Sequence, residues 1–179
     1  SKQLDNDKND LPKFTSYMCG ANRPGHFSGV YRIVKFLFEI LQPNYAYFGK
    51  KDFQQLLLIK YIANTYFSKL KIIGVDTVRD KNNIALSSRL SKISSESFHR
   101  VKLIFQTLMI MKKKLHHGLN YNTIKEDCLL ELENNNISVE YLDLRSLDTL
   151  EEQVNINQPC GIFIACYIDN IRLIDNIEI

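Results

Sequence analysis

Residues 45–55 of this 179-residue chain read YAYFGKKDFQQ, and this stretch decides the predicted fold. Residues 45–48 form an apolar run with the length of a buried strand, and Gly49 follows as the residue of a tight turn. From Asp52 onward apolar residues recur at helical spacing. The stretch therefore predicts a strand, a turn and a helix in immediate succession.

The residues on either side extend this pattern. Helical spacing predicts a helix over residues 28–41, which Pro43 and Asn44 are expected to end. A second buried strand is predicted at residues 71–75. Helix, strand, helix and strand in this order favour a parallel sheet covered by helices, an α/β fold.

Beyond residue 75 the pattern changes, which predicts a second domain. Residues 76–93 are polar and irregular, and helices are expected at about 95–115 and 122–133. A strand is predicted near 137–141, and a pair of strands at 162–168 and 171–174 around Asp169 and Asn170. The boundary is expected near residues 77–90.

Composition and charge limit the classes of partner. A net charge of +3, from 23 basic and 20 acidic residues, is too small and too scattered to indicate nucleic acid. No apolar stretch is long enough to predict a membrane span, and residues 1–10 are polar and expected to form a loop. The four cysteines lack the paired spacing of metal ligands, so no metal site is predicted, and such thiols indicate a reducing, cytoplasmic location.

The turn at Gly49, Lys50, Lys51 and Asp52 is the first candidate site. Ligands of open parallel sheets bind at the carboxyl ends of strands, where a lysine and a helix N-terminus favour phosphate oxygens. The alternative is structural, because Asp52 and Gln55 have the spacing of a helix-capping pair. Local spacing alone favours the cap, although Asp52 could serve both purposes.

Two further candidates are weak by themselves. Ser87, Ser88 and Arg89 offer hydroxyl and guanidinium donors for a polyphosphate, although such residues in a polar loop are usually only solvated. His26 could act as an acid or base, but a lone histidine before a helix is more often structural.

Taken together, these stretches resemble the pantothenate synthetase family, the pantoate–β-alanine ligases. The stretches that carry the resemblance, in order, are Arg23-Pro24-Gly25-His26-Phe27, Gly29-Val30, Gln42-Pro43, Tyr47-Phe48-Gly49, Lys51-Asp52, Gln54-Gln55, Gly74-Val75, Thr77-Val78-Arg79, Ala85-Leu86-Ser87-Ser88-Arg89, residues 139–144 and Arg172-Leu173-Ile174-Asp175-Asn176. Each is poor evidence alone, whereas the ordered set is specific.

The resemblance implies an enzyme that condenses pantoate with β-alanine, using ATP and Mg²⁺. Pantoate would form an adenylate with release of pyrophosphate, and the amine of β-alanine would then displace AMP. The implied fold is a Rossmann-like domain of the HxGH nucleotidyltransferase type, of which residues 1–78 would be the C-terminal half. Residues 79–179 would form a small α+β domain that closes over ATP. Family members are typically homodimers.

The resemblance also implies roles for individual residues. Lys51 and Arg89 would be catalytic, through charge on the phosphates, and Gln55 would hold pantoate. The implied ATP-binding residues are Gly49, Lys50, Lys51, Asp52, Val78, Leu86, Ser87, Ser88 and Arg89. Three positions depart from the family pattern: Lys50 replaces the usual Glu, Asn83 a Gly, and Leu90 an Asn.

The His-x-Gly-His stretch of the family's N-terminal portion does not occur in these residues. Two alternatives to the ligase therefore stay open. One is a non-catalytic remnant that lacks half of the site, and the other is a different adenylyl-transferring enzyme of the same fold.

We expect residues 1–179 alone not to be a competent ligase. Half a site leaves the adenine and the attacking carboxylate unfixed, and orientation effects of this kind are worth ~7–11 kcal/mol of barrier. The test is to purify this chain, confirm its folding by circular dichroism, and assay pantothenate formation with ATP, Mg²⁺, pantoate and β-alanine. Robust product formation by the folded chain would contradict the expectation.

Overall fold

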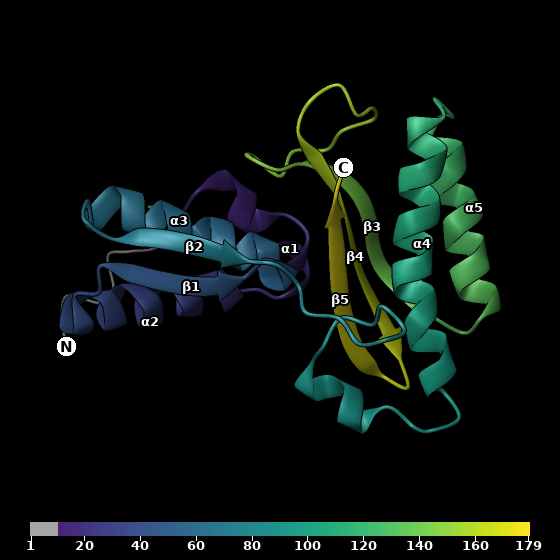
Figure 1. Ribbon diagram of the computed structural model, residues 1–179, viewed down its shortest axis with the longest axis horizontal. Helices are drawn as coiled ribbons and strands as arrows, with labels where there is room; N and C mark the ends of the chain where they lie inside the picture. Colours follow the sequence, from purple (N-terminus) through teal and green to yellow (C-terminus); the bar gives the residue numbers. More distant parts are fainter. Residues whose placement is uncertain (1–10) are drawn as a thin grey trace. The chain divides into compact units, whose positions relative to one another are not determined.

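The computed structural model describes residues 11–179, so the loop expected at residues 1–10 lies outside the described residues. The chain divides into two compact units (Figure 1). The first ends at Asp76 and the second spans Thr77–Ile179. Each unit has its own sheet, and the two sheets differ in kind: β1 and β2 are parallel, whereas β3, β4 and β5 are antiparallel.

The first unit is built around a short parallel sheet. Its elements are η2 (Lys13–Ser16), α1 (Cys19–Asn22), α2 (His26–Leu41), β1 (Tyr45–Gly49), η3 (Lys50–Asp52), α3 (Phe53–Tyr66) and β2 (Lys71–Val75). The strands pair in register from Tyr45 opposite Lys71 to Gly49 opposite Val75. Because parallel strands need a crossover, α3 returns the chain to the start of β2. The predicted helix, strand, helix and strand are confirmed.

Aromatic side chains hold α2 against the sheet and α3. The Phe38 ring meets the Phe48 ring at 6.4 Å and the Phe67 ring at 5.6 Å between centroids, both edge to face. Such pairs contribute beyond the area that they bury. Other apolar side chains of α2, among them Ile33, Phe36 and Ile40, are exposed.

The second unit places two helices against one face of an antiparallel sheet (Figure 1). Its elements are η4 (Ser88–Lys92), α4 (Phe98–His116), α5 (Tyr121–Asn134), β3 (Ser138–Ser146), β4 (Cys160–Ile168) and β5 (Ile171–Glu178). β4 is the central strand and is buried along almost its whole length, which explains its nearly unbroken apolar sequence. A parallel α/β unit followed by an α+β unit confirms the predicted fold class.

A β-bulge interrupts the alternation predicted near residues 137–141. Val139 pairs with Cys166 and Tyr141 with Ala165, so Glu140 is an extra residue in β3. Its carboxylate accepts hydrogen bonds from Arg172 Nη2 at 2.6 Å and from the Tyr167 hydroxyl at 3.0 Å. The hydrogen bond to Glu140 raises the pKa of Tyr167. The bulge thus directs a carboxylate at neighbouring residues of β4 and β5.

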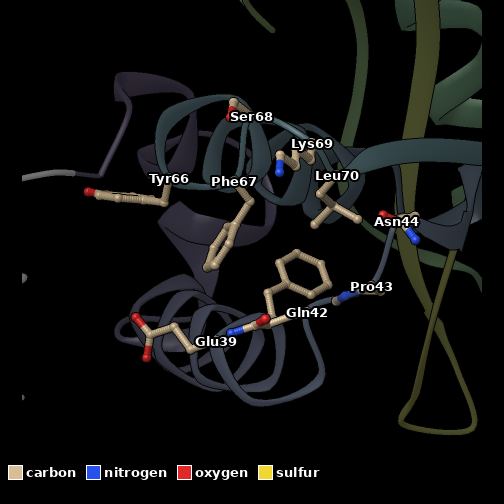
Figure 2. A pocket seen from close by; sticks show the side chains of 10 residues that line it. Glu39, Gln42, Pro43, Asn44, Tyr66, Phe67, Ser68, Lys69 and Leu70 are labelled. Atoms are coloured by element: carbon tan, nitrogen blue, oxygen red, sulfur yellow. The ribbon is translucent and has the colours of Figure 1, made fainter.

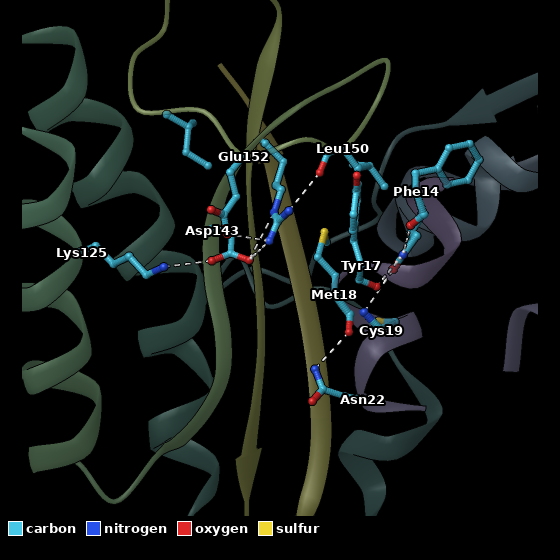
Figure 3. A network of polar contacts seen from close by, with 12 residues as sticks. Phe14, Tyr17, Met18, Cys19, Asn22, Lys125, Asp143, Leu150 and Glu152 are labelled. Atoms are coloured by element: carbon cyan, nitrogen blue, oxygen red, sulfur yellow. Dashed lines mark hydrogen bonds and ion pairs between the residues drawn. The ribbon is translucent and has the colours of Figure 1, made fainter. Parts of the chain in front are cut away.

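A buried ion-pair network joins α5 to β3 (Figure 3). Asp143 accepts hydrogen bonds from Lys125 Nζ at 3.0 Å and from Arg145 Nη2 at 2.7 Å. Arg145 also donates to Glu152 Oε1 at 3.0 Å and to the Leu150 carbonyl at 3.1 Å. The network holds the segment after β3 in place, including Leu150, whose φ of +55° a leucine seldom adopts.

The turn between β4 and β5 fixes the start of α4. Asp169 and Asn170 have φ values of +51° and +60°, which are typical of a two-residue hairpin turn. The Asp169 carboxylate accepts the Ser97 hydroxyl at 2.6 Å, the Ser94 hydroxyl at 2.8 Å and Arg100 Nη2 at 3.0 Å. These contacts hold residues 94–97 outside the helix, so α4 begins at Phe98 rather than near residue 95 as predicted.

Because of the Asp169 turn, the thermal stability of the chain should decrease at low pH. Hydrogen bonds from Ser97 and Ser94 lower the Asp169 pKa to about 2 from its usual 3.8. A lowered folded-state pKa contributes stability that is fully present above pH 4 and is lost as the pH falls through about 2. Asp169→Asn should therefore lower the thermal midpoint at pH 7, and the gap from the unchanged chain should shrink between pH 4 and pH 2. Scanning calorimetry at both ends of this range measures the gap. A gap that does not vary with pH would contradict the assignment.

Candidate functional site

The loop at residues 49–52 lies where the sequence places it, at the carboxyl end of a parallel strand. Gly49 is exposed, and a Cβ atom added there would meet no atom within 4 Å, so the backbone is open to close approach. The 3-10 turn of Lys50, Lys51 and Asp52 leads directly into α3. Backbone N–H groups and the positive end of a helix dipole at this position favour an anion.

The capping interpretation of this loop is wrong for Asp52. The Asp52 side chain is exposed and makes no capping hydrogen bond to α3. The carboxylate is therefore open to solvent at the start of the helix.

Lys50 braces the loop against the neighbouring strand. Its ammonium lies 2.8 Å from Asp76 Oδ1. The aliphatic part of the side chain crosses β2 at Gly74, where an added Cβ atom would lie 3.4 Å from Lys50 Cγ and 3.1 Å from Leu56 Cδ2. Asp76 thus offsets the positive charge that Lys50 adds beside Lys51.

Gln54 and Gln55, neighbours in sequence, have different surroundings. Gln54 is 4% exposed and ties α3 to the segment before α2. Its amide donates to the carbonyls of Phe14 and Tyr17, both at 2.8 Å, and accepts from the Cys19 N–H at 3.2 Å. Figure 3 shows these three partners together. Gln55 is half-buried, and its side chain makes no hydrogen bond within residues 11–179, so its amide is available to a ligand.

A β-hairpin in the second unit carries the other predicted nucleotide contacts. The Leu86 N–H donates to the Val78 carbonyl at 3.0 Å, and both side chains are exposed, Val78 at 63% and Leu86 at 52%. Asn83, at the tip, has a φ of +63°, the left-handed conformation expected when Asn replaces Gly. The hairpin brings Val78 and Leu86 together as an exposed apolar pair.

Ser87, Ser88 and Arg89 continue from the hairpin into η4. The Ser87 hydroxyl accepts the Arg89 N–H at 3.2 Å, and the Ser88 side chain is exposed. Arg89 Nη1 donates to the Arg172 carbonyl at 3.3 Å. This contact uses one of five guanidinium donors, and within the described residues the others are left open to an anion. The predicted site residues thus fall into two groups, with residues 49–55 in the first unit and Val78 and residues 86–89 in the second.

His26 is engaged in a local contact. Arg23 Nη1 lies 3.2 Å from His26 Nε2, and because a guanidinium can only donate, Nε2 accepts. The ring also lies against Phe27, with centroids 4.9 Å apart. These contacts fit the structural interpretation of His26.

Cys166 is fully buried in the core of the second unit. Burial raises the pKa of the Cys166 thiol to about 12, so this thiol is not a nucleophile at neutral pH. No three His, Cys, Asp or Glu side chains among residues 11–179 are grouped to hold a metal ion. In the same residues no helix is both long and apolar enough to cross a membrane.

A cavity of about 420 Å³ lies at the opposite end of the parallel sheet (Figure 2). It is lined by the ends of α2 and α3 and by the residues just before β1 and β2, including Phe38, Glu39, Asn44, Phe67 and Leu70. The loop at residues 49–52 is at the carboxyl end of the strands, so the cavity and the predicted phosphate loop are separate features.

Comparison with known proteins finds relatives in the same family that the sequence resembles. The family described as "Pantoate-beta-alanine ligase" matches residues 6–178. The pantothenate synthetase of Shewanella baltica (strain OS223) is 37% identical over 169 residues, and that of Leptospira interrogans (strain Fiocruz L1-130) is 33% identical over 171. Each alignment covers 94% of this chain but 60% of the relative, so the chain spans about 60% of the length of these curated relatives.

Solved structures agree. Pantothenate synthetase from Thermus thermophilus superposes with a TM-score of 0.85 at 32% identity, over 92% of this chain and 60% of that one. A pantoate–β-alanine ligase from Francisella tularensis, in complex with β-γ ATP and β-alanine, superposes with a TM-score of 0.71 at 30% identity. That match covers 92% of this chain and 55% of the Francisella chain.

The two glutamines give a matched test of structural against ligand roles. Gln54→Glu would set a carboxylate against two carbonyls, and losing these buried hydrogen bonds should cost about 1–3 kcal/mol of unfolding free energy. Gln55→Glu breaks no hydrogen bond within the described residues and should leave the unfolding free energy nearly unchanged. Urea unfolding of both variants and the unchanged chain measures the difference. Equal losses of unfolding free energy in the two variants would show that Gln55 also stabilises the fold.

Proposed function

The chain belongs to the pantoate–β-alanine ligase family, and on that premise we propose that it serves the ATP-dependent joining of pantoate to β-alanine. The observation that carries this proposal is the loop at residues 49–52. A lysine, an exposed glycine and a helix N-terminus meet there at the carboxyl end of a parallel strand. Open α/β sheets bind their ligands at this position.

ATP and β-alanine are supported as substrates by the Francisella relative, whose structure contains β-γ ATP and β-alanine. In the first step, the pantoate carboxylate attacks the α-phosphorus of ATP, and the bond to the departing pyrophosphate breaks. In the second, the amine of β-alanine attacks the acyl carbon of the pantoyl adenylate, forms the amide and releases AMP with loss of a proton. In the transition states of both steps, negative charge develops on phosphate or acyl oxygens.

The proposed catalytic residues act on that charge. Lys51 would stabilise the phosphate oxygens from the loop before α3, and Arg89 would do so from the segment after the hairpin. Val78 would contact the nucleotide through its backbone, and its exposed side chain and that of Leu86 would add an apolar surface. Ser88 would offer a hydroxyl. Preorganised donors aimed at developing charge are commonly the largest contribution to such reactions.

Gln55 is the proposed contact for pantoate. Its side chain amide makes no hydrogen bond within residues 11–179, unlike the buried amide of Gln54. An amide can donate to the carboxylate or hydroxyls of pantoate and also accept from a hydroxyl. This bonding capacity suits a small hydroxy acid.

Mg²⁺ would enter with the nucleotide. This ion is usually held by substrate phosphates and waters with one or two carboxylates, and it neutralises phosphate charge. Asp52, exposed and without a capping bond, is the carboxylate of the loop that fits such a role.

We also propose that the enzyme is cytoplasmic and homodimeric. All four cysteines are buried and carry thiols, as expected in a reducing compartment.

Lys51→Ala tests the proposed function directly. In a protein that joins this chain to the N-terminal portion typical of the family, the substitution should slow pyrophosphate release from ATP and pantoate by ~10²–10³, as loss of one preorganised donor does. Lys60→Ala is the matched control, because Lys60 is an exposed lysine farther along α3. Near-normal turnover of the Lys51 variant would remove this lysine from the site. An inactive unchanged protein would overturn the proposed reaction.

A further inference from the structure

Arg79 makes an unusually complete set of contacts for a residue in a polar loop. Its guanidinium forms a two-pronged ion pair with Asp175 of β5, at 2.7 and 2.9 Å. It also donates to the Asn176 carbonyl at 3.2 Å and to the Asn83 carbonyl at 3.1 Å. The guanidinium carbon lies 4.2 Å from the centre of the Phe105 ring on α4. Arg79 therefore links the hairpin tip to both the sheet and a helix of the second unit.

This ion pair is sheltered from solvent. The Arg79 side chain is 17% exposed and that of Asp175 4%. A two-pronged guanidinium–carboxylate pair fixes direction as well as distance, and water screens it little when it is buried. The pair is thus suited to hold a backbone segment in one position.

The segment that Arg79 holds carries the proposed nucleotide contacts. Val78 precedes Arg79, and Leu86 returns opposite Val78 through the 3.0 Å backbone hydrogen bond. Between them, Arg79 and Ala85 form an antiparallel bridge, and Asp80 Oδ1 accepts the N–H groups of Asn82 at 2.8 Å and Ile84 at 2.9 Å. The hairpin is therefore one braced unit whose exposed edge is Val78 and Leu86.

The far end of the same segment is tied to the same strand. Arg89 donates to the carbonyl of Arg172, which is the second residue of β5. The stretch from residue 79 to residue 89 is thus anchored on β5 at both ends, through Asp175 near one end and Arg172 near the other. Both anchors lie in residues 172–176, one of the stretches that carry the family resemblance.

We infer that Arg79 and Asp175 are positioning residues, a clamp that sets the hairpin edge and the Ser87-Ser88-Arg89 segment in the geometry that binds ATP. The inference rests on the proposed function, because the ATP that the hairpin would bind comes from that proposal. Donors and apolar contacts that are held before the ligand arrives lose less conformational freedom on binding. In this inference the clamp acts through the hairpin that it holds, not through a contact of its own with the nucleotide.

Hydrogen exchange on the 179-residue chain tests the clamp without nucleotide. Arg79→Lys cannot form a two-pronged pair, so the amides of Asp80 and Leu86 should exchange at least tenfold faster, while amides of the β3–β4 ladder keep their rates. Asp175→Asn should do the same and serves if Arg79→Lys does not fold. Arg145→Lys is the matched control, because Arg145 forms a comparably buried pair with Asp143, away from the hairpin. Unchanged hairpin amides in both clamp variants would overturn the inference.

Steady-state kinetics in the extended protein tests the purpose of the clamp. Arg79→Lys should raise the ATP KM at least tenfold with little change in the β-alanine KM, whereas Arg145→Lys should leave the ATP KM unchanged. The Arg79→Lys/Asp175→Asn double variant should lose no more than the worse single variant, because both break one pair. A loosened hairpin with an unchanged ATP KM would overturn the positioning role. An unchanged protein without ATP-dependent turnover would instead overturn the proposed function, and the exchange rates would still decide the clamp.

Discussion

Parallel pairing of β1 with β2 is the constraint on which the first unit depends. Two parallel strands cannot be joined by a tight turn, so the chain must leave the end of β1, travel back through α3 and re-enter at the start of β2. The loop after Gly49 therefore becomes the point where backbone N–H groups, the helix dipole and Lys51 converge. Any ligand role of residues 49–55 follows from that pairing.

The second unit depends on a different constraint, the burial of β4. A central strand that is buried along almost its whole length is almost wholly apolar, and the polar groups near it must find partners among themselves. The charged side chains accordingly form pairs at the edges of the core, such as Arg172 with Glu140 and Arg79 with Asp175. These pairs position the loops around the core, including the hairpin at residues 78–86.

Local patterns predicted the elements, because helical spacing, buried apolar runs and turn residues act over a few residues. The sequence was enough to predict several features: the strands at 45–49 and 71–75, the hairpin turn at Asp169 and Asn170, and the left-handed conformation of Asn83. Contacts across long separations were not. Nothing local shows that Gln54 binds the carbonyl of Phe14 or that Arg79 pairs with Asp175, and the bulge at Glu140 breaks the very alternation used to predict its strand. The sequence offered one signal for the clamp: Arg79 and Asp175 carry opposite charges, and both lie in stretches that resemble the family.

The bulge at Glu140 also governs how β3 tolerates changes in length. Side chains alternate between the faces of a strand, so one residue more or less exchanges the two sets. Glu140 is the extra residue at the bulge, and the pairs on either side of it oppose consecutive residues of β4, so the rest of β3 keeps its register without it. Deleting Glu140 would therefore restore regular pairing and leave Leu142 and Leu144 in the core, although the contacts of its carboxylate with β4 and β5 would be lost. Deleting a residue after the bulge would instead turn leucines and charges to the wrong faces. Natural length variation should therefore be found at the bulge itself or in the segment between β3 and β4, rather than elsewhere within β3.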